Sequence, residues 1–189
     1  MYIAAQIKFD NADWNGAVAS YTNYLDRFPT GLNSIQAHFN RGEALFDLKR
    51  YNEAIQDYAY ISDQGNSVFV ETANHRAANI AYYSTQNFPE AQKYYGRLEQ
   101  TATTEELLFE AQQFGMRSAF YASDFQRLPV IGERLINNPR ATTQDHAEAY
   151  YFIGKAYLAQ QDNDRALAAF GKNIQLSGDD VHSAEARYW

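Results

Sequence analysis

Residues 35–61 read IQAHFNRGEALFDLKRYNEAIQDYAYI, and this stretch has the pattern of two helices joined by a tight turn. On both sides of Lys49-Arg50, apolar residues recur at the i, i+3, i+4 spacing of an amphipathic helix. They are Ala37, Ala44, Leu45 and Leu48 on one side, and Tyr51, Ala54, Ile55, Tyr58 and Ile61 on the other. Because the two basic residues leave room for a short turn only, the pattern predicts an antiparallel helical hairpin.

The same pattern recurs five times along the 189 residues. One residue near the start of each expected second helix marks the repeat, at spacings of 37, 37, 37 and 38: Ala17, Ala54, Ala91, Leu128 and Ala166. Helix pairs are expected near 2–9 with 14–27, 35–48 with 51–61, 68–84 with 88–100, 105–122 with 125–137, and 144–159 with 164–176. A period of this size indicates an all-α solenoid, in which each unit buries its apolar face against its neighbours.

The fifth unit has the clearest motif: Tyr150, Ile153-Gly154, Tyr157, Ala166 and Phe170. In these residues the chain resembles the tetratricopeptide repeat family, and the second unit is close to the same pattern. The resemblance implies a right-handed α-solenoid superhelix of five antiparallel helix-turn-helix repeats, open at both ends. We expect a single array over residues 1–189, with repeats at about 1–31, 32–66, 67–103, 104–141 and 142–178 and the start of a sixth at 179–189.

The period of 37–38 residues is longer than the family's usual length of about 34. In this respect the chain resembles the longer-period repeats of bacterial cell-envelope proteins. That resemblance implies a location in the periplasm or cell envelope, and the cytoplasm is the alternative. Residues 182–189 align with residues 145–152 at a further shift of 37, and the first unit begins inside its first helix. We therefore expect the chain to be part of a longer array.

Composition and motifs argue against several classes of function. A net charge of −7 does not suit a nucleic-acid surface, which needs clustered lysine and arginine. The chain contains no run of about 18 apolar residues that could cross a membrane. It also contains no cysteine. The four histidines form no H-E-x-x-H motif, and the paired carboxylates stand at helix starts and turns. We predict no catalytic centre, no metal and no cofactor, and we expect Gly154 and Gly171 to permit close helix packing.

The resemblance to the tetratricopeptide repeats places ligand binding on the first helices, which line the concave face in that family. The positions that meet a peptide there correspond to Phe39, Glu43, Phe46, Arg76, Tyr83, Arg117, Tyr121, Tyr151 and Lys155. Aromatic side chains interleaved with arginine suit an extended peptide. The cations Arg76, Arg117 and Lys155 would favour an acidic ligand or a C-terminal carboxylate. Alternatively, these cations balance nearby carboxylates on a solvated face.

Taken together, these features predict a non-catalytic scaffold for proteins or peptides, acting in the assembly of a bacterial envelope complex. One alternative is a spacer or self-association segment whose open ends stack on further repeats. Another is the accessory arm of a larger envelope enzyme, with its active site outside these residues.

Overall fold

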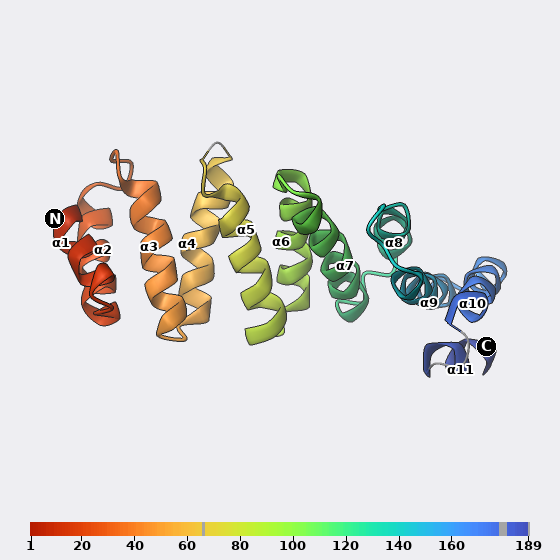
Figure 1. The fold of residues 1–189 in the computed structure, drawn as a ribbon. Helices are drawn as coiled ribbons and strands as arrows, with labels where there is room; N and C mark the ends of the chain where they lie inside the picture. Colours follow the sequence, from red (N-terminus) through yellow and green to blue (C-terminus); the bar gives the residue numbers. More distant parts are fainter. Residues whose placement is uncertain (66, 178–180, 189) are drawn as a thin grey trace. The chain divides into compact units, whose positions relative to one another are not determined.

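In a computed structural model, which describes residues 1–65, 67–177 and 181–188, every regular element of the described residues is a helix (Figure 1). The chain divides into two compact units, residues 1–87 and residues 88–189. Within each unit the helices form antiparallel hairpins that stack on one another, which is the arrangement of an α-solenoid. The predicted fold class is confirmed.

Unit 1 contains two complete hairpins and the first helix of a third. Its helices are α1 (Tyr2–Asp10), α2 (Trp14–Arg27), α3 (Ser34–Asp47), α4 (Tyr51–Gln64) and α5 (Val70–Asn79), followed by the π-helical turn η1 (Ile80–Ser84). α2 packs on α3, and α4 packs on α5, so that each hairpin covers the next. The sequence predicted one continuous helix over 68–84. The structure instead begins α5 at Val70 and closes it with η1, where Thr85 N donates to Ile80 O over 3.0 Å.

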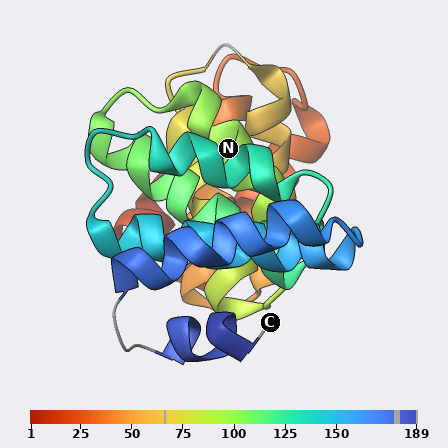
Figure 2. The same ribbon diagram turned by 90° about the vertical axis from the view of Figure 1, so that its right-hand side faces the viewer.

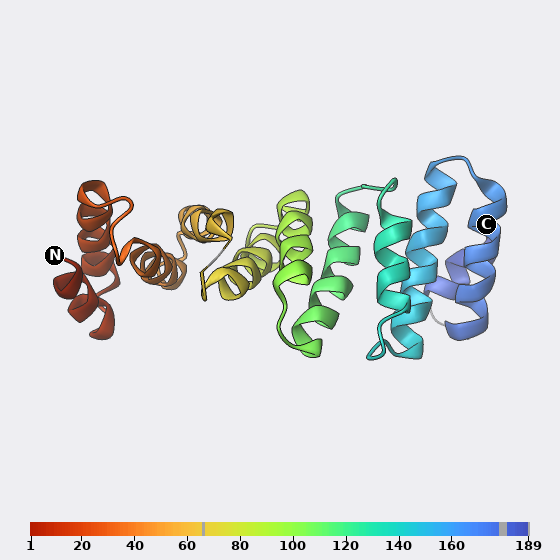
Figure 3. The same ribbon diagram turned by 90° about the horizontal axis from the view of Figure 1, so that it is seen from above.

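Unit 2 is also built of stacked antiparallel hairpins. Its helices are α6 (Phe88–Thr101), α7 (Glu105–Tyr121), α8 (Leu128–Ile136), α9 (Thr143–Ala159), α10 (Asn163–Ser177) and α11 (Val181–Tyr188). Figure 3 shows α7, α8, α9 and α10 side by side and nearly antiparallel, and Figure 2 shows α10 running alongside α9. The junction expected at residues 177–179 includes Gly178 and Asp179, which lie outside the described residues.

The helix α8 is shorter than the predicted span of 125–137. Residues 125–127 form a turn, and the Asp124 carboxylate accepts a hydrogen bond from Arg127 N over 3.3 Å. Pro129, in the first turn of α8, has no N–H to donate to the carbonyl of Phe125, so a regular helix beginning at Phe125 would lack that hydrogen bond. The Phe125 ring lies beside Phe120 at 6.3 Å. As a result, α8 has nine residues, whereas α6 has 14 and α10 has 15.

The residues that mark the repeat lie where the two helices of a hairpin cross. All five markers are buried: Ala17, Ala54, Ala91, Leu128 and Ala166. One turn later, a large ring fills the space between the helices in four of the five repeats: Tyr21, Tyr58, Tyr95 and Phe170. Small residues let the backbones approach, and the rings then supply most of the buried apolar area. Gly132 takes the place of the ring in the fourth repeat.

The five hairpin turns share one backbone conformation. Each contains a non-glycine residue in the left-handed region, with φ between 50° and 61°: Ala12, Lys49, Gln86, Ser123 and Gln161. In four of these turns, the next backbone N–H donates to a carbonyl five residues earlier, as from Arg50 to Leu45 over 2.8 Å. This bond caps the end of the first helix as in a Schellman motif, where glycine is the usual residue.

Ala54→Leu is expected to lower the free energy of unfolding by about 1–3 kcal/mol, because three extra carbon atoms must enter a fully packed crossing. Urea denaturation followed by circular dichroism measures the loss. Ala19→Leu is the matched control, since Ala19 is exposed on α2 and both residues favour helix. Equal unfolding midpoints for the two variants would mean that the helices do not cross at Ala54.

Candidate peptide-binding face

The nine residues predicted to meet a peptide all belong to the first helices of their repeats. Phe39, Glu43 and Phe46 lie on α3, Arg76 on α5 and Tyr83 on η1. In unit 2, Arg117 and Tyr121 lie on α7, while Tyr151 and Lys155 lie on α9. We call the surface formed by α3, α5 and η1 in unit 1, and by α7, α9 and α11 in unit 2, the first-helix face of that unit.

In unit 1 four of the predicted residues form one cluster. The Arg76 guanidinium pairs with the Glu43 carboxylate at 2.9 Å and lies 5.6 Å from the centre of the Phe46 ring. Phe39 stacks on Phe69 with ring centres 4.8 Å apart. The cluster therefore combines aromatic rings with an arginine whose side chain is 44% exposed. Such a surface offers both apolar contact and hydrogen-bond donors to a ligand.

Glu43 also connects this cluster to the core of its own repeat. Its carboxylate accepts a hydrogen bond of 2.6 Å from the hydroxyl of Tyr58, one of the rings between the two helices. Burial raises the pKa of the Tyr58 hydroxyl, and the Glu43 carboxylate raises it further. The hydroxyl therefore stays protonated and donates its hydrogen bond to Glu43 from within the same hairpin. Arg76 donates to the other oxygen of Glu43 from the next repeat.

Two exposed tyrosines extend the first-helix face. Tyr83 is 58% exposed, and its ring lies 4.9 Å from that of Tyr82. In unit 2, Tyr121 is 52% exposed, and its ring lies 4.9 Å from that of Phe88. An exposed ring beside a second ring offers a ligand apolar contact area together with a hydroxyl group.

The cations of unit 2 bridge neighbouring repeats. Arg117 donates from Nε and Nη2 to the Glu148 carboxylate at 2.8–3.2 Å, and its guanidinium lies 5.1 Å from the centre of the Phe114 ring. Lys155 Nζ lies 2.7 Å from Glu185 Oε1, so α9 is joined to α11 in the same way that α7 is joined to α9. Each pair links the first helices of successive repeats.

Tyr151 was predicted to lie on the ligand-binding surface, but the structure buries its side chain. It is 6% exposed, and its hydroxyl donates to Glu185 from beneath the face. Burial raises the pKa of this hydroxyl, and the Glu185 carboxylate contributes to the increase. Family positions gave the correct helix for Tyr151. They did not show that α11 would cover its ring.

The three cations of the predicted stripe are all ion-paired. Arg76, Arg117 and Lys155 each pair with a glutamate of a neighbouring repeat, so each pair joins two repeats. Of the three, Arg76 has the most exposed side chain, so it is the one that a ligand can reach most directly.

A buried charge cluster in unit 1 was not predicted. The Asp57 carboxylate, only 2% exposed, accepts two hydrogen bonds from Arg41, at 2.9 and 2.7 Å, and lies 2.6 Å from His38 Nδ1. Arg41 also donates to Thr22 over 3.0 Å. The cluster therefore joins α2, α3 and α4. A separation of 16 residues between Arg41 and Asp57 was the available indication, because residues 15–16 apart face each other across this hairpin.

Within the described ranges, no three or more histidine, cysteine, aspartate or glutamate side chains are grouped so that they could hold a metal ion. His38 contacts Asp57, and His75 lies 2.9 Å from Asn79. The side chain of His182 lies outside the described residues. No helix in the described part of the chain is long and apolar enough to cross a bilayer.

Comparison with known families agrees with the helical hairpins and their small-residue crossings. Two models described as tetratricopeptide repeat match the chain, over residues 3–67 and 147–180, which together are just over half of its length. The chain belongs to the tetratricopeptide repeat family. The resemblance in the sequence motifs is thereby confirmed. No curated protein sequence matches this tetratricopeptide repeat chain.

Solved structures share the tetratricopeptide repeat fold at low sequence identity. YrrB, described as a TPR protein with an unusual peptide-binding site, is 15% identical with a TM-score of 0.59, and the match covers 98% of this chain and 89% of YrrB. A structure of MamA is 17% identical with a TM-score of 0.53, covering 92% and 87% of the two chains. A fragment of MamA from Desulfovibrio magneticus RS-1 is 14% identical with a TM-score of 0.50, covering 93% of each chain. These similarities concern the fold alone.

Proposed function

We propose that this tetratricopeptide repeat chain is a non-catalytic scaffold that holds an extended peptide on its first-helix face. The fold supports a role in protein–protein interaction. The observation that carries the proposal is the row of aromatic rings on the first helices, where Phe39, Phe46 and Arg76 form a cluster and Tyr83 is exposed nearby in sequence. Tyr121 repeats this exposure in unit 2.

The ion pairs refine the chemistry expected of the ligand. An acidic side chain or a C-terminal carboxylate at Arg76 would have to share the guanidinium with Glu43. Sharing it weakens the existing ion pair between Arg76 and Glu43. Apolar and aromatic side chains of the ligand meet no such competition at Phe39 and Phe46. We therefore propose a ligand whose main contacts are apolar, with a carboxylate at Arg76 as a secondary contact.

The cellular setting is part of the same proposal. The longer repeat period supports a role in assembling a bacterial envelope complex, in the periplasm or cell envelope. YrrB provides a precedent for peptide binding by a protein of similar fold. A spacer or self-association role is the alternative, and Ile3 and Ile7 favour it, since they lie one turn apart on α1 and are both exposed. The accessory-arm hypothesis has no observation of its own in these residues.

Tyr121→Ala is expected to weaken binding of a peptide selected on the purified chain by fivefold or more, because an exposed ring supplies contact area at low entropic cost. Peptides would be enriched from a random phage-displayed library, and their affinities would be measured by fluorescence anisotropy. Tyr121 is more than half exposed, so the thermal midpoint should stay within about 1–2 °C of the parent. Tyr83→Ala tests unit 1 in the same way.

Leu32→Ala is the matched control, because Leu32 is fully exposed and belongs to the connection between α2 and α3, not to a first helix. Equal losses of affinity for Leu32→Ala and the two tyrosine variants would contradict the proposed face. Failure to enrich any peptide, together with a concentration-dependent increase in mass by sedimentation that Ile3→Glu abolishes, would establish self-association in its place.

A further inference from the structure

The first helix of the third repeat ends differently from those of the other four repeats. In those four, the N–H after the left-handed turn residue donates to a carbonyl five residues earlier, over 2.8–2.9 Å: Asp13 to Lys8, Arg50 to Leu45, Asp124 to Ala119 and Asp162 to Tyr157. In the third repeat, Asn87 N donates over 2.8 Å to Ala81 O, which is six residues earlier. The π-helical turn η1 therefore holds one residue more than the other helix ends. Turns of this kind are rare and are frequently found at functional sites.

Contacts with the preceding repeat show the same displacement along α5. On α3, Asn40 Nδ2 donates to Gln6 Oε1 of the first repeat over 2.8 Å. On α5, Arg76 Nη2 donates to Glu43 Oε2 of the second repeat over 2.9 Å. Gln6 and Glu43 are 37 residues apart, as the repeat period requires, whereas Asn40 and Arg76 are 36 apart. The register of α5 is therefore displaced by one residue from the period, and the extra residue of η1 restores the period before α6 begins.

This displacement places Tyr83 in the same structural position as Tyr121. Each tyrosine is the second residue after the carbonyl that caps its helix, which belongs to Ala81 in unit 1 and to Ala119 in unit 2. Counting by the period of 37 residues pairs Tyr83 with Phe120 instead. The hydrogen bonds correct that pairing, and they place the extra residue between Tyr83 and the turn.

The two tyrosines also have the same kind of neighbour. A half-buried ring precedes each of them, Tyr82 in unit 1 and Phe120 in unit 2. Each pair of rings is close to edge-to-face, with centres 4.9 Å apart at 71° in unit 1 and 5.6 Å apart at 68° in unit 2. Because this arrangement is favourable for two aromatic rings, the half-buried ring fixes the direction of the exposed tyrosine.

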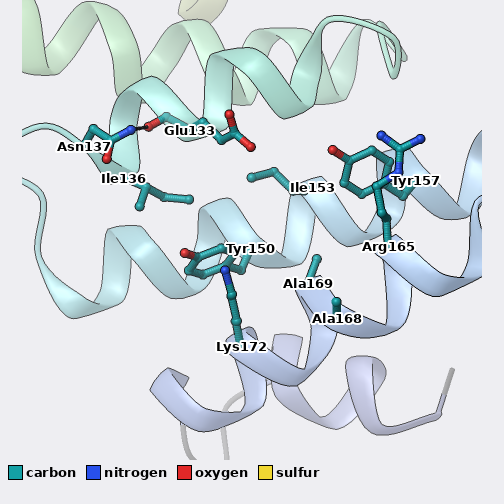
Figure 4. A pocket seen from close by; sticks show the side chains of 10 residues that line it. All are labelled: Glu133, Ile136, Asn137, Tyr150, Ile153, Tyr157, Arg165, Ala168, Ala169 and Lys172. Carbon is teal, nitrogen blue, oxygen red and sulfur yellow. Dashed lines mark hydrogen bonds between the residues drawn. The ribbon is translucent and has the colours of Figure 1, made fainter.

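The other repeats have no ring in this position. Asp10 and Asp47 stand there in the first two repeats, and Ala159 stands there in the fifth. In the fifth repeat the capping carbonyl belongs to Tyr157. The ring of Tyr157 lines a hollow of about 330 Å³ among α8, α9 and α10, with the Arg165 guanidinium 4.5 Å from its centre (Figure 4). The exposed tyrosine therefore occurs in two successive repeats, once in each unit.

We propose that Tyr83 and Tyr121 are two copies of one ligand-contact position, and that Tyr82 and Phe120 are the positioning residues that hold them. Each copy offers an aromatic ring and a hydroxyl group whose direction is fixed before a ligand arrives, which lowers the entropic cost of the contact. Under the peptide-binding function proposed above, on which this assignment rests, each copy takes one aromatic or large aliphatic side chain of the ligand.

Two single-residue deletions in η1 test the assignment. Each shortens the π-helical turn to the regular length, with Ala81 again five residues before the capping N–H. Deletion of Ser84 leaves Tyr83 two residues after Ala81, so it should change peptide affinity by less than about twofold. Deletion of Tyr82 moves Tyr83 into the half-buried place, so it should weaken binding by about fivefold or more, as Tyr83→Ala does. Affinities are measured by fluorescence anisotropy with peptides that were enriched on the parent chain and respond to Tyr83→Ala.

Chemical labelling tests the position of residue 83 without a ligand. The chain has no cysteine, so Tyr83→Cys provides a single thiol whose rate of reaction with iodoacetamide reports its exposure. We expect the rate to match that of Tyr121→Cys within about threefold, both in the parent and after deletion of Ser84. Deletion of Tyr82 should slow the reaction by about fivefold or more, towards the rate of Phe46→Cys, because Phe46 is half-buried.

Substitutions that keep the chain length provide the controls, and they serve also if circular dichroism shows that a deletion unfolds the chain. Tyr82→Phe copies the ring of Phe120 and should leave affinity and labelling unchanged, whereas Tyr82→Ala should weaken binding by about threefold. Asp47→Ala is the matched control and should have no effect, because Asp47 holds the same position in a repeat without the ring. Equal results for the two deletions, or equal losses from Asp47→Ala and Tyr83→Ala, would overturn the assignment.

The assignment and the proposed function fail in different ways. Peptides that respond to Tyr121→Ala, with none that responds to Tyr83→Ala, would reject the copy in unit 1 and leave the proposed function intact. Failure to enrich any peptide would reject the proposed function and the ligand contact together. The labelling rates would then still show whether the two tyrosines share one structural position.

Discussion

Asp57→Ala is expected to lower the free energy of unfolding by about 3–5 kcal/mol. Removing one partner of a buried ion pair leaves the other charge without compensation. Here the variant would leave the Arg41 guanidinium and the His38 ring without the carboxylate that both of them contact, while Arg41 keeps its hydrogen bond to Thr22. Urea denaturation followed by circular dichroism measures the change. Hydrogen exchange of the amides of α3 should report it locally, because repeat arrays lose stability unit by unit.

Two further variants show whether the loss comes from the charge cluster. Asp57→Asn keeps the shape and one acceptor oxygen, so it should cost less than Asp57→Ala. Glu53→Ala removes the Arg50–Glu53 pair one turn away, in which both side chains are exposed, and should change stability by no more than about 0.5 kcal/mol. A cost below about 1 kcal/mol for Asp57→Ala would show that Arg41 and His38 find other partners or water.

The helical hairpins could be predicted from the sequence because their determinants are local and repeated. The spacing of Ala54, Ile55, Tyr58 and Ile61 specifies which side of α4 is buried, and all four are buried as predicted. The same pattern recurs with a period of 37–38 residues, so errors in one unit are corrected by the others. Helix ends were less predictable. α8 starts at Leu128 and not at Phe125, and Pro129 has no N–H with which to bond the Phe125 carbonyl in a longer helix.

Contacts between repeats could not be predicted, because they depend on how far one hairpin is displaced along the next. Arg76 pairs with Glu43 of the preceding repeat, whereas Arg117 pairs with Glu148 of the following one. The paired residues are 33 and 31 positions apart in the sequence. A small displacement of one hairpin along the next would therefore bring different residues into contact. The burial of Tyr151 has the same origin, since α11 supplies Glu185 above it. The sequence identified the residues of the candidate site, but it did not show which of them form ion pairs or hydrogen bonds with a neighbouring repeat.

The hairpin turns show a different limit. Glycine usually marks a left-handed helix cap, but Lys49 and Ser123 adopt this conformation without it. The hydrogen bond that caps each first helix determines the conformation of the turn. The type of the turn residue therefore does not indicate that its backbone is left-handed.

Gly154→Leu is expected to lower the free energy of unfolding by about 3 kcal/mol or more. A β-carbon at Gly154 would lie 2.5 Å from Cε1 and 2.6 Å from Cδ1 of the Phe170 ring, which is itself buried between α9 and α10. Neither helix can move away without breaking its packing on the other, so a larger side chain forces strain on both. Replacing Phe170 by leucine in the Gly154→Leu background should recover part of the loss, because it vacates the contested space.

Gly171→Leu in the same hairpin is the matched control, and it corrects the expectation that both glycines permit close packing. Nothing lies within 4 Å of a β-carbon built at Gly171, so the substitution meets no neighbour. Leucine favours a helix interior over glycine by nearly 1 kcal/mol. Gly171→Leu should therefore leave stability unchanged or raise it by up to about 1 kcal/mol, with urea midpoints as the measurement. A comparable loss in both variants would mean that helix propensity and burial, and not the contact with Phe170, explain why glycine stands at position 154.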